Sequence, residues 1–333
     1  MHTLKKLFTV SLILSVLPVL AQYTDVINSN RPGVSKSAFS VGTNVLQFEL
    51  GAFTVKEEHT PLQYEVSGFG IDFSARYGLL WEQLEINIEG VYQNDTFSSI
   101  STALPFENSR ANFKNLAIGA KYLIYDPYKD PEYDKPNLYS YHANRRFKWM
   151  SLIPAIAIYA GANFDSDDNP YIPNSAIFPS VREGGFSPKV MVATQNNFAG
   201  GWVFVMNLLM DRIGTDFSEF QYIFTLTHSF SEKWVLFGEA QGIDSDFYSD
   251  NIFRVGGAYL WSKDLQLDAN IAFNTKDTPS VFNIAFGASY RFDWHKDKVI
   301  DNGGKVSDKV DTSNRKTKKR KKKTDFDDGS NNQ

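Results

Sequence analysis

Charged side chains recur at alternate positions in several apolar stretches of this chain, and the chemistry they offer is pairing between opposite charges. If each stretch is an extended strand, its charged residues share one face and its apolar residues the other. Rings of charged side chains inside a pore narrow it and select the ions that pass. We therefore predict that one set of residues lines a lumen and sets its selectivity: Arg31, Asp72, Arg76, Glu85, Glu89, Lys121, Glu239 and Arg254. The simpler alternative is that these charges fill a barrel interior without forming a substrate path.

Arg31 belongs to an Arg31-Pro32-Gly33 turn that precedes the first predicted strand. One hypothesis is that this segment folds into the lumen as a plug, where Arg31 pairs with an inward carboxylate and narrows the pore. The candidate partners are Glu49, Glu85, Glu89 and Glu239. The alternative hypothesis is a structural turn that closes one end of the barrel.

Catalytic and metal-binding residues form no recognisable constellation. A hydrolase would need a serine or aspartate within hydrogen-bonding reach of a histidine, but the chain has only five histidines and no Gly-x-Ser-x-Gly motif. His228 shares a predicted lipid-facing side with Phe224 and Leu226. The acidic segments at 165–168 and 244–246 lack the glycine and terminal glutamate of an EF-hand loop. We expect no enzyme activity, no cofactor and no metal site.

A basic cluster lies near the C-terminus, where eight of the nine residues from 315 to 323 are lysine or arginine. Such a cluster would suggest nucleic-acid binding in a cytosolic protein. Because we expect export, we predict no nucleic-acid partner, and instead contact with anionic lipid headgroups or an acidic protein. A solvated tail without a partner is the alternative. The predicted partner-binding residues are Arg315, Lys316, Lys318, Lys319, Arg320, Lys321, Lys322 and Lys323.

The N-terminus has the three regions of a secretory signal peptide. Lys5 and Lys6 precede the apolar run Leu7–Leu20, and Val19-Leu20-Ala21 provides a small-residue cleavage site. This order of charged, apolar and cleavage regions is typical of a cleaved signal, and the run is shorter than the roughly 18 residues of a spanning helix. The chain contains no cysteine, which removes disulfides and lipid attachment at a cysteine.

The elements that must position the charged residues are strands of about a dozen residues in which apolar and polar side chains alternate. Globular strands are usually about 5–6 residues long, whereas an outer-membrane barrel needs about 9–12. The alternation is clearest in Ser218–Phe230, Lys233–Asp244, Asn251–Ser262, Asp264–Thr275 and Val281–Phe292. Upstream, the same pattern predicts strands at 44–56, 63–78, 83–95, 112–124, 150–164, 187–198 and 201–212.

These strands predict an all-β fold, a single transmembrane antiparallel β-barrel of about 12 strands, with 10 or 14 as alternatives. An even strand number places both termini on one side of the membrane. We expect this side to be the periplasm because most of its connections are short, although the long connection 125–149 lies there as well. The predicted organisation is a signal peptide at 1–21, a periplasmic or lumenal segment at 22–43, the barrel at 44–292 and a disordered basic periplasmic tail at 293–333.

The segment Ile27–Ser37, followed by Val45–Gly51, resembles the N-terminus of the outer-membrane transporter family of phenol-degradation MetA-pathway proteins. In that family an Asp-Arg-Pro-Gly element precedes a Gln-x-Glu-x-Gly first strand, and this chain has Asn30 where Asp is usual. Phe237–Gly242 and Arg254–Ala258 resemble the later strands. The resemblance implies an outer-membrane barrel of the transporter type, of a kind common in Bacteroidetes and Proteobacteria.

The leading functional hypothesis is a narrow passive channel or transporter for small molecules, held in outer-membrane lipid. The alternative is an accessory barrel in a larger secretion or protein-assembly complex, which would bind other outer-membrane or periplasmic proteins. The connection 125–149 and the basic tail are the segments that this alternative would use.

Overall fold

The computed structural model describes residues 26–99, 106–129, 139, 149–172, 184–295, 299–300 and 306–307. The predicted signal peptide and the basic cluster at 315–323 lie outside the described residues, as does most of the 125–149 connection. The chain divides into two units, Met1–His295 and Lys296–Gln333. In the second unit, β13 (Val299–Ile300) pairs with β14 (Val306–Ser307).

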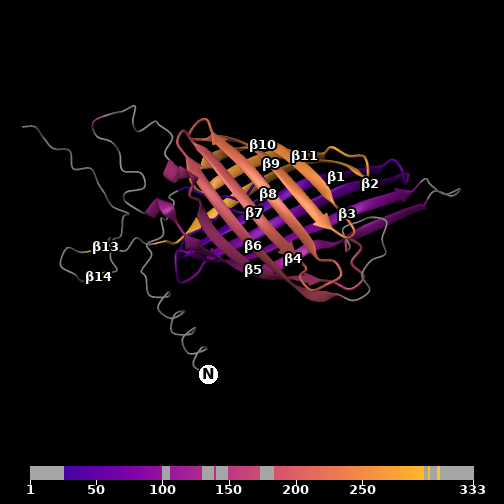
Figure 1. The fold of residues 1–333 in the computed structure, drawn as a ribbon, viewed down its shortest axis with the longest axis horizontal. Helices are drawn as coiled ribbons and strands as arrows, with labels where there is room; N and C mark the ends of the chain where they lie inside the picture. Colours follow the sequence, from indigo (N-terminus) through magenta and orange to yellow (C-terminus); the bar gives the residue numbers. More distant parts are fainter. Residues whose placement is uncertain are drawn as a thin grey trace, which may run out of the picture. The chain divides into compact units, whose positions relative to one another are not determined.

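The first unit contains twelve antiparallel strands that close into a barrel (Figure 1). Each strand pairs with its neighbours in sequence, and β1 closes the sheet on β12, with Val45 opposite Asp293. A closed sheet has no unpaired edge, so its backbone groups are satisfied in lipid. The strands are β1 (Val45–His59), β2 (Tyr64–Gly78), β3 (Leu84–Ser99), β4 (Phe106–Tyr125), β5 (Ala155–Asp165), β6 (Gly185–Phe198), β7 (Trp202–Asp211), β8 (Glu219–Ser229), β9 (Trp234–Ser245), β10 (Asp250–Ser262), β11 (Leu265–Asn274) and β12 (Ser280–Asp293).

The predicted fold and the twelve strands are confirmed, with differences at a few strand ends. β3 and β4 continue beyond the predicted 95 and 112, because pairs such as Asp95 opposite Arg110 extend the ladder into the expected loop. β5 begins at Ala155 rather than 150, after the short 3₁₀ helix η2 (Trp149–Leu152). Proline lacks the N–H that a ladder needs, so Pro154 marks the start of this strand.

The alternation of side chains separates a lipid face from a lumenal face. On β1, Gln47 and Glu49 are buried, whereas Phe48 and Leu50 are 45% and 57% exposed. Soluble monomers rarely expose a continuous apolar surface of this kind, and outer-membrane barrels present it to lipid. The outer face of this barrel therefore contacts lipid. Other exposed apolar residues include Phe69, Ile71, Ile86, Ile88, Ile118, Ile158, Val190, Val192, Phe224 and Leu226.

The strand ends carry the aromatic residues expected at a membrane interface. The exposed tryptophans are Trp81, Trp149, Trp202, Trp234, Trp261 and Trp294. They cluster at the end of the barrel where β1 starts and β12 finishes, as in the aromatic girdles of membrane barrels. His228 stacks on Trp202 with ring centroids 4.2 Å apart, which confirms that it faces away from the lumen.

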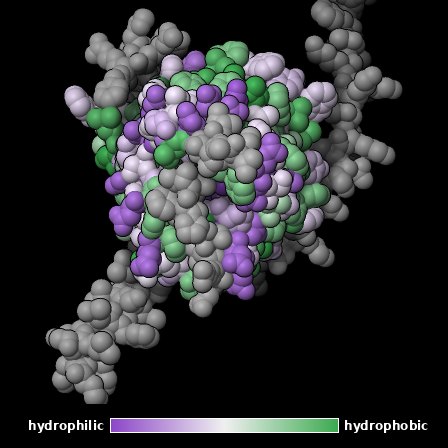
Figure 2. Space-filling model, turned by 90° about the vertical axis from the view of Figure 1, so that its right-hand side faces the viewer, coloured by the Kyte–Doolittle hydropathy of each residue, from purple (hydrophilic) through white to green (hydrophobic). Residues whose placement is uncertain are grey.

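Loop lengths distinguish the two ends of the barrel. The end where β1 starts has tight turns, such as 199–201, where Gly200 and Gly201 adopt positive φ values. Its one long connection, 126–154, includes the 3₁₀ helix η1 (Pro127–Lys129). The opposite end carries the long connection 166–184, and the face at this end shows hydrophilic side chains mixed with apolar ones (Figure 2). Short turns are typical of the periplasmic end. None of the described helices is long and apolar enough to cross a membrane.

Candidate functional site

The N-terminal segment, residues 26–44, lies inside the barrel and is bonded to several of its walls. The Val34 amide donates to Glu239 on β9 (3.1 Å), and the Lys36 amide donates to Asn207 on β7 (2.6 Å). The Val41 amide donates to Glu85 on β3 (3.0 Å). Since these strands lie on different sides of the closed sheet, the segment crosses the lumen.

The guanidinium of Arg31 is held by two carboxylates from non-adjacent strands. Its Nε donates to both oxygens of Asp268 on β11 (3.2 and 3.3 Å), and Nη2 lies 3.1 Å from the same carboxylate. Nη1 pairs with Asp72 on β2. The side chain of Asp268 is fully buried, and Arg31 is only 7% exposed. A bidentate contact of this kind fixes both the position and the orientation of a guanidinium.

Two glycines complete this site. Gly51 on β1 lies opposite Gly287 on β12, Asp72 flanks Gly51, and Asp268 flanks Gly287. The four residues form one row across four adjacent strands. A Cβ on either glycine would overlap the Arg31 guanidinium, so glycine permits the close approach at this row. We call Gly51, Asp72, Asp268 and Gly287 the Arg31 cradle.

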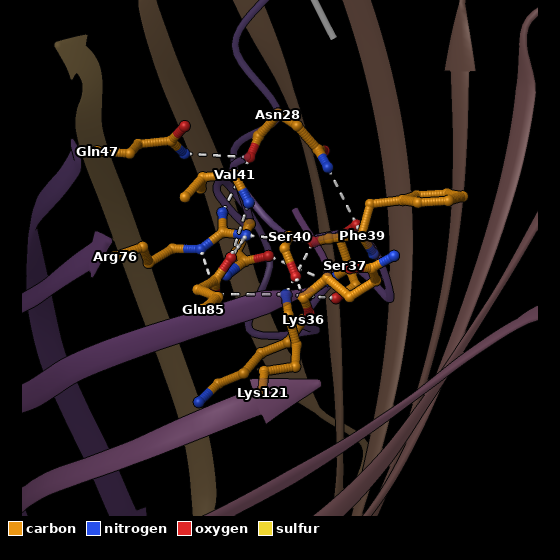
Figure 3. A network of polar contacts seen from close by, with 12 residues as sticks. Asn28, Lys36, Ser37, Phe39, Ser40, Val41, Gln47, Arg76, Glu85 and Lys121 are labelled. Atoms are coloured by element: carbon orange, nitrogen blue, oxygen red, sulfur yellow. Dashed lines mark hydrogen bonds and ion pairs between the residues drawn. The ribbon is translucent and has the colours of Figure 1, made fainter. Parts of the chain in front are cut away.

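A second buried cluster lies nearer the end of the barrel where β1 starts (Figure 3). Arg76 makes a bidentate contact with Glu85, both bonds being 2.9 Å, and reaches Glu49 at 3.2 Å. Lys121 lies 3.3 Å from Glu85 and donates to the carbonyls of Ser37 and Phe39 at 2.9 Å. These charged side chains are at most 4% exposed. Because carbonyls of the N-terminal segment complete the bonding of Lys121, the segment and the barrel wall form one network.

A third cluster contains two lysines that share one carboxylate. Glu89 on β3 pairs with Lys36 of the N-terminal segment and, at 3.1 Å, with Lys189 on β6. The Lys36 ammonium also lies 4.6 Å from the ring centroid of Tyr159, a favourable cation–π distance. On the far wall, Glu239 accepts from Arg254 at 3.1 Å. The N-terminal segment thus has charged side chains on two sides, with Glu89 and Lys189 on one and Glu239 and Arg254 on the other.

Every predicted lumen residue faces the interior. The predicted partners of Arg31 are wrong, because it pairs with Asp72 and Asp268. The four glutamates proposed as its partners instead bind Asn30, Val34, Ser35, Lys36 and Val41 of the same segment, or residues of the wall. Gly51 and Gly287 are functional positions that the charge pattern did not predict, although inward glycines in a strand indicate a close approach.

Between the N-terminal segment and the 166–184 connection, the lumen contains a cavity of about 480 Å³. Residues 30–34 and Lys36 border it, and Tyr171 borders it from the 166–184 connection. The Tyr171 hydroxyl lies 3.0 Å from the Gln93 carbonyl and 3.1 Å from the Arg110 carbonyl. Burial raises the pKa of Tyr171 above its ordinary value, so the hydroxyl stays protonated and can donate.

No group of His, Asp or Glu in the described part of the chain is arranged to hold a metal ion. Asp244 of the acidic segment at 244–246 instead accepts a hydrogen bond from Ser249 (2.9 Å). Asp165 likewise has a protein partner, because Arg212 donates to it at 3.3 Å. One carboxylate of each acidic segment thus has a partner within the protein.

The family described as "Putative MetA-pathway of phenol degradation" matches residues 29–292. Among solved structures, an outer-membrane channel from Pseudomonas putida F1 is 8% identical, with 80% of this chain and 100% of that chain covered and a TM-score of 0.48. The Pseudomonas putida toluene transporter TodX is 9% identical, with 82% and 98% covered and a TM-score of 0.42. A KdgM porin with oligogalacturonate is 8% identical, with 74% and 99% covered and a TM-score of 0.41. No curated protein matches the chain.

Proposed function

The chain belongs to the family described as "Putative MetA-pathway of phenol degradation", and we propose that it is a narrow passive channel for small molecules in the outer membrane. The observation that carries this proposal is the polar lumen with its cavity of about 480 Å³. A cavity of this size suits small solutes, and a 12-stranded barrel is narrower than a 16- to 18-stranded porin.

The N-terminal segment is the gate of the proposed channel. It crosses the lumen below the cavity and is fixed by the Arg31 cradle and by the clusters at Glu85 and Glu89. Solutes pass when this segment shifts, and the charged residues that hold it set the selectivity. The residues of this proposal are Arg31, Asp72, Arg76, Glu85, Glu89, Lys121, Glu239 and Arg254.

The proposal includes export through a signal peptide cleaved after Ala21 and a basic tail, 293–333, on the periplasmic side. It assigns residues 22–43 to the gate and 44–292 to the barrel, and it contains no catalytic step. The accessory role in a larger assembly would use the 125–149 connection and the tail, most of which lie outside the described residues. No observation favours that role over the channel.

Single-channel recording tests the proposal. Purified full-length protein in a planar bilayer should conduct weakly, and a variant lacking residues 27–40 should show a larger conductance. A deletion variant that folds, shown by heat-modifiable migration in gels, but conducts as the intact protein does would contradict the gate. An absence of conductance in both proteins would contradict the channel itself.

A further inference from the structure

Among the residues that the structure describes, Lys114 borders the cavity without an ion-pair partner. It lies on β4, and no carboxylate of the described residues lies within ion-pair distance of its ammonium. The charged groups that act on it most strongly are Glu57 on β1, Glu219 on β8, Asp95 on β3 and Arg110 on β4. Since these come from different sides of the barrel, the ammonium lies in the lumen and not against lipid.

The position of Lys114 follows from a β-bulge. Asn115 lies opposite Val91, whereas Phe113 lies opposite Tyr92, so Lys114 is the extra residue between two consecutive pairs. Without the bulge, strict alternation beside the inward Asn115 would turn Lys114 towards lipid. Bulges of this kind re-aim a side chain and are common next to functional sites.

The carboxylates around Lys114 are each engaged elsewhere. Asp95 accepts from Arg110 at 2.7 Å, Glu57 accepts from the Tyr64 hydroxyl at 3.0 Å, and Glu219 accepts from Gln221. Lys114 is therefore a half-buried cation that faces the cavity, and of the three carboxylates only Asp95 is paired with another cation among the described residues. A carboxylate bound at this ammonium would form a charge-assisted hydrogen bond that no protein carboxylate forms in the described part of the chain.

The strands β6 to β10 contribute an apolar wall to the same cavity. It is formed by Met191, Leu209, Ile223, Ile243 and Ile252. Four of these side chains are at most 8% exposed to solvent, so their apolar surface meets the cavity or the neighbouring wall. This surface suits an apolar body.

From these features we infer that the cavity binds a small organic anion, with its carboxylate on Lys114 and its apolar body against the wall of Met191, Leu209, Ile223, Ile243 and Ile252. This inference rests on the proposed channel and names the class of solute that it carries. A carboxylate supplies the missing partner of the ammonium, and burial of the body releases water from apolar surface.

Calorimetric titration of the full-length protein in detergent tests the inference with four probes: hexanoate, hexanamide, acetate and hexylammonium. We expect hexanoate to bind more tightly than the other three, because only hexanoate has both the charge and the apolar body. Lys114→Met should lower the affinity for hexanoate by roughly 10- to 100-fold, since a hydrogen bond to a charged group contributes about 1.5–3 kcal/mol. Lys114→Arg should keep most of the affinity. Lys233→Met, which removes an exposed lysine from a periplasmic turn, is the matched control.

Equal affinity of the intact protein for hexanoate and hexanamide would overturn the inference, and this result needs no variant to fold. Unchanged hexanoate affinity in folded Lys114→Met, or tighter binding of hexylammonium, would overturn it as well. Conductance in potassium chloride, measured on the same preparation, separates the two proposals. A protein that conducts without binding hexanoate contradicts only the binding site, and one that binds without conducting contradicts only the channel.

Discussion

Gly51 and Gly287 lie opposite each other on β1 and β12, at the seam where the barrel closes, and the guanidinium of Arg31 lies over both. Asp72 on β2 and Asp268 on β11 continue the same row on either side of these two strands. The N-terminal segment is thus attached where the first and last strands meet, so this binding site for Arg31 exists only when the barrel is closed.

A methyl group in the cradle should release the gate. Gly51→Ala and Gly287→Ala each place a Cβ against the Arg31 guanidinium, and overpacking of this kind costs about 1–3 kcal/mol. The population of released segment should rise about tenfold or more. Trypsin cleavage after Lys36, followed by mass spectrometry, measures this release. Gly238→Ala is the control, because its Cβ would have no atom within 4 Å; equal cleavage in all three variants would refute the role of the cradle.

The two carboxylates of the Arg31 cradle should differ in how strongly they hold Arg31. The side chain of Asp268 is fully buried, whereas that of Asp72 is 32% exposed. Removing one partner of a buried pair costs about 3–5 kcal/mol, and a solvent-screened pair contributes about 1 kcal/mol or less. Asp268→Asn should therefore raise the open-channel probability far more than Asp72→Asn in single-channel records. A larger effect of Asp72→Asn than of Asp268→Asn would show that burial does not determine how strongly each carboxylate holds Arg31.

Glu89 should control the charge preference of the pore. Glu89→Gln leaves Lys36 and Lys189 without their shared carboxylate, so the lumen becomes more cationic and should favour anions. The reversal potential in a potassium chloride gradient should shift towards that of chloride. In the double variant Glu89→Gln and Lys36→Met, the reversal potential should return towards that of the intact protein. Glu232→Gln, on an exposed turn, should leave the potential as it is; an unshifted potential in Glu89→Gln would place Glu89 outside the ion path.

Tyr171 should anchor the outer connection to the cavity. Tyr171→Phe removes the hydroxyl that bonds the carbonyls of β3 and β4, a loss of about 1 kcal/mol. Hydrogen exchange of the Tyr171 and Ile172 amides should become several-fold faster. Because burial raises the pKa of Tyr171, the hydroxyl contributes fully below the ordinary tyrosine pKa of about 10, so the effect should be equal at about pH 7 and about pH 9. Tyr122→Phe, on the lipid face, is the control, and equal exchange in both variants would contradict the anchor.

Much of the wall could be predicted from the sequence, because side chains alternate with a strict period of two in a strand. The period predicts twelve strands and assigns residues such as Arg76, Glu85 and Lys121 to the lumen. It fails where the period breaks. Lys114 lies at a bulge, whose position depends on the pairing of β3 with β4, and no local pattern in the sequence marks it.

The sequence by itself determined the barrel, the face on which most strand residues lie and a set of charged groups that point into the interior. Only the tertiary structure decided which charges meet. Arg31 and Asp268 are 237 residues apart, and they pair because β12 closes on β1 in a register that places two glycines beneath the guanidinium. Alternation specifies the face of the sheet on which a side chain lies, but closure and register specify its neighbours.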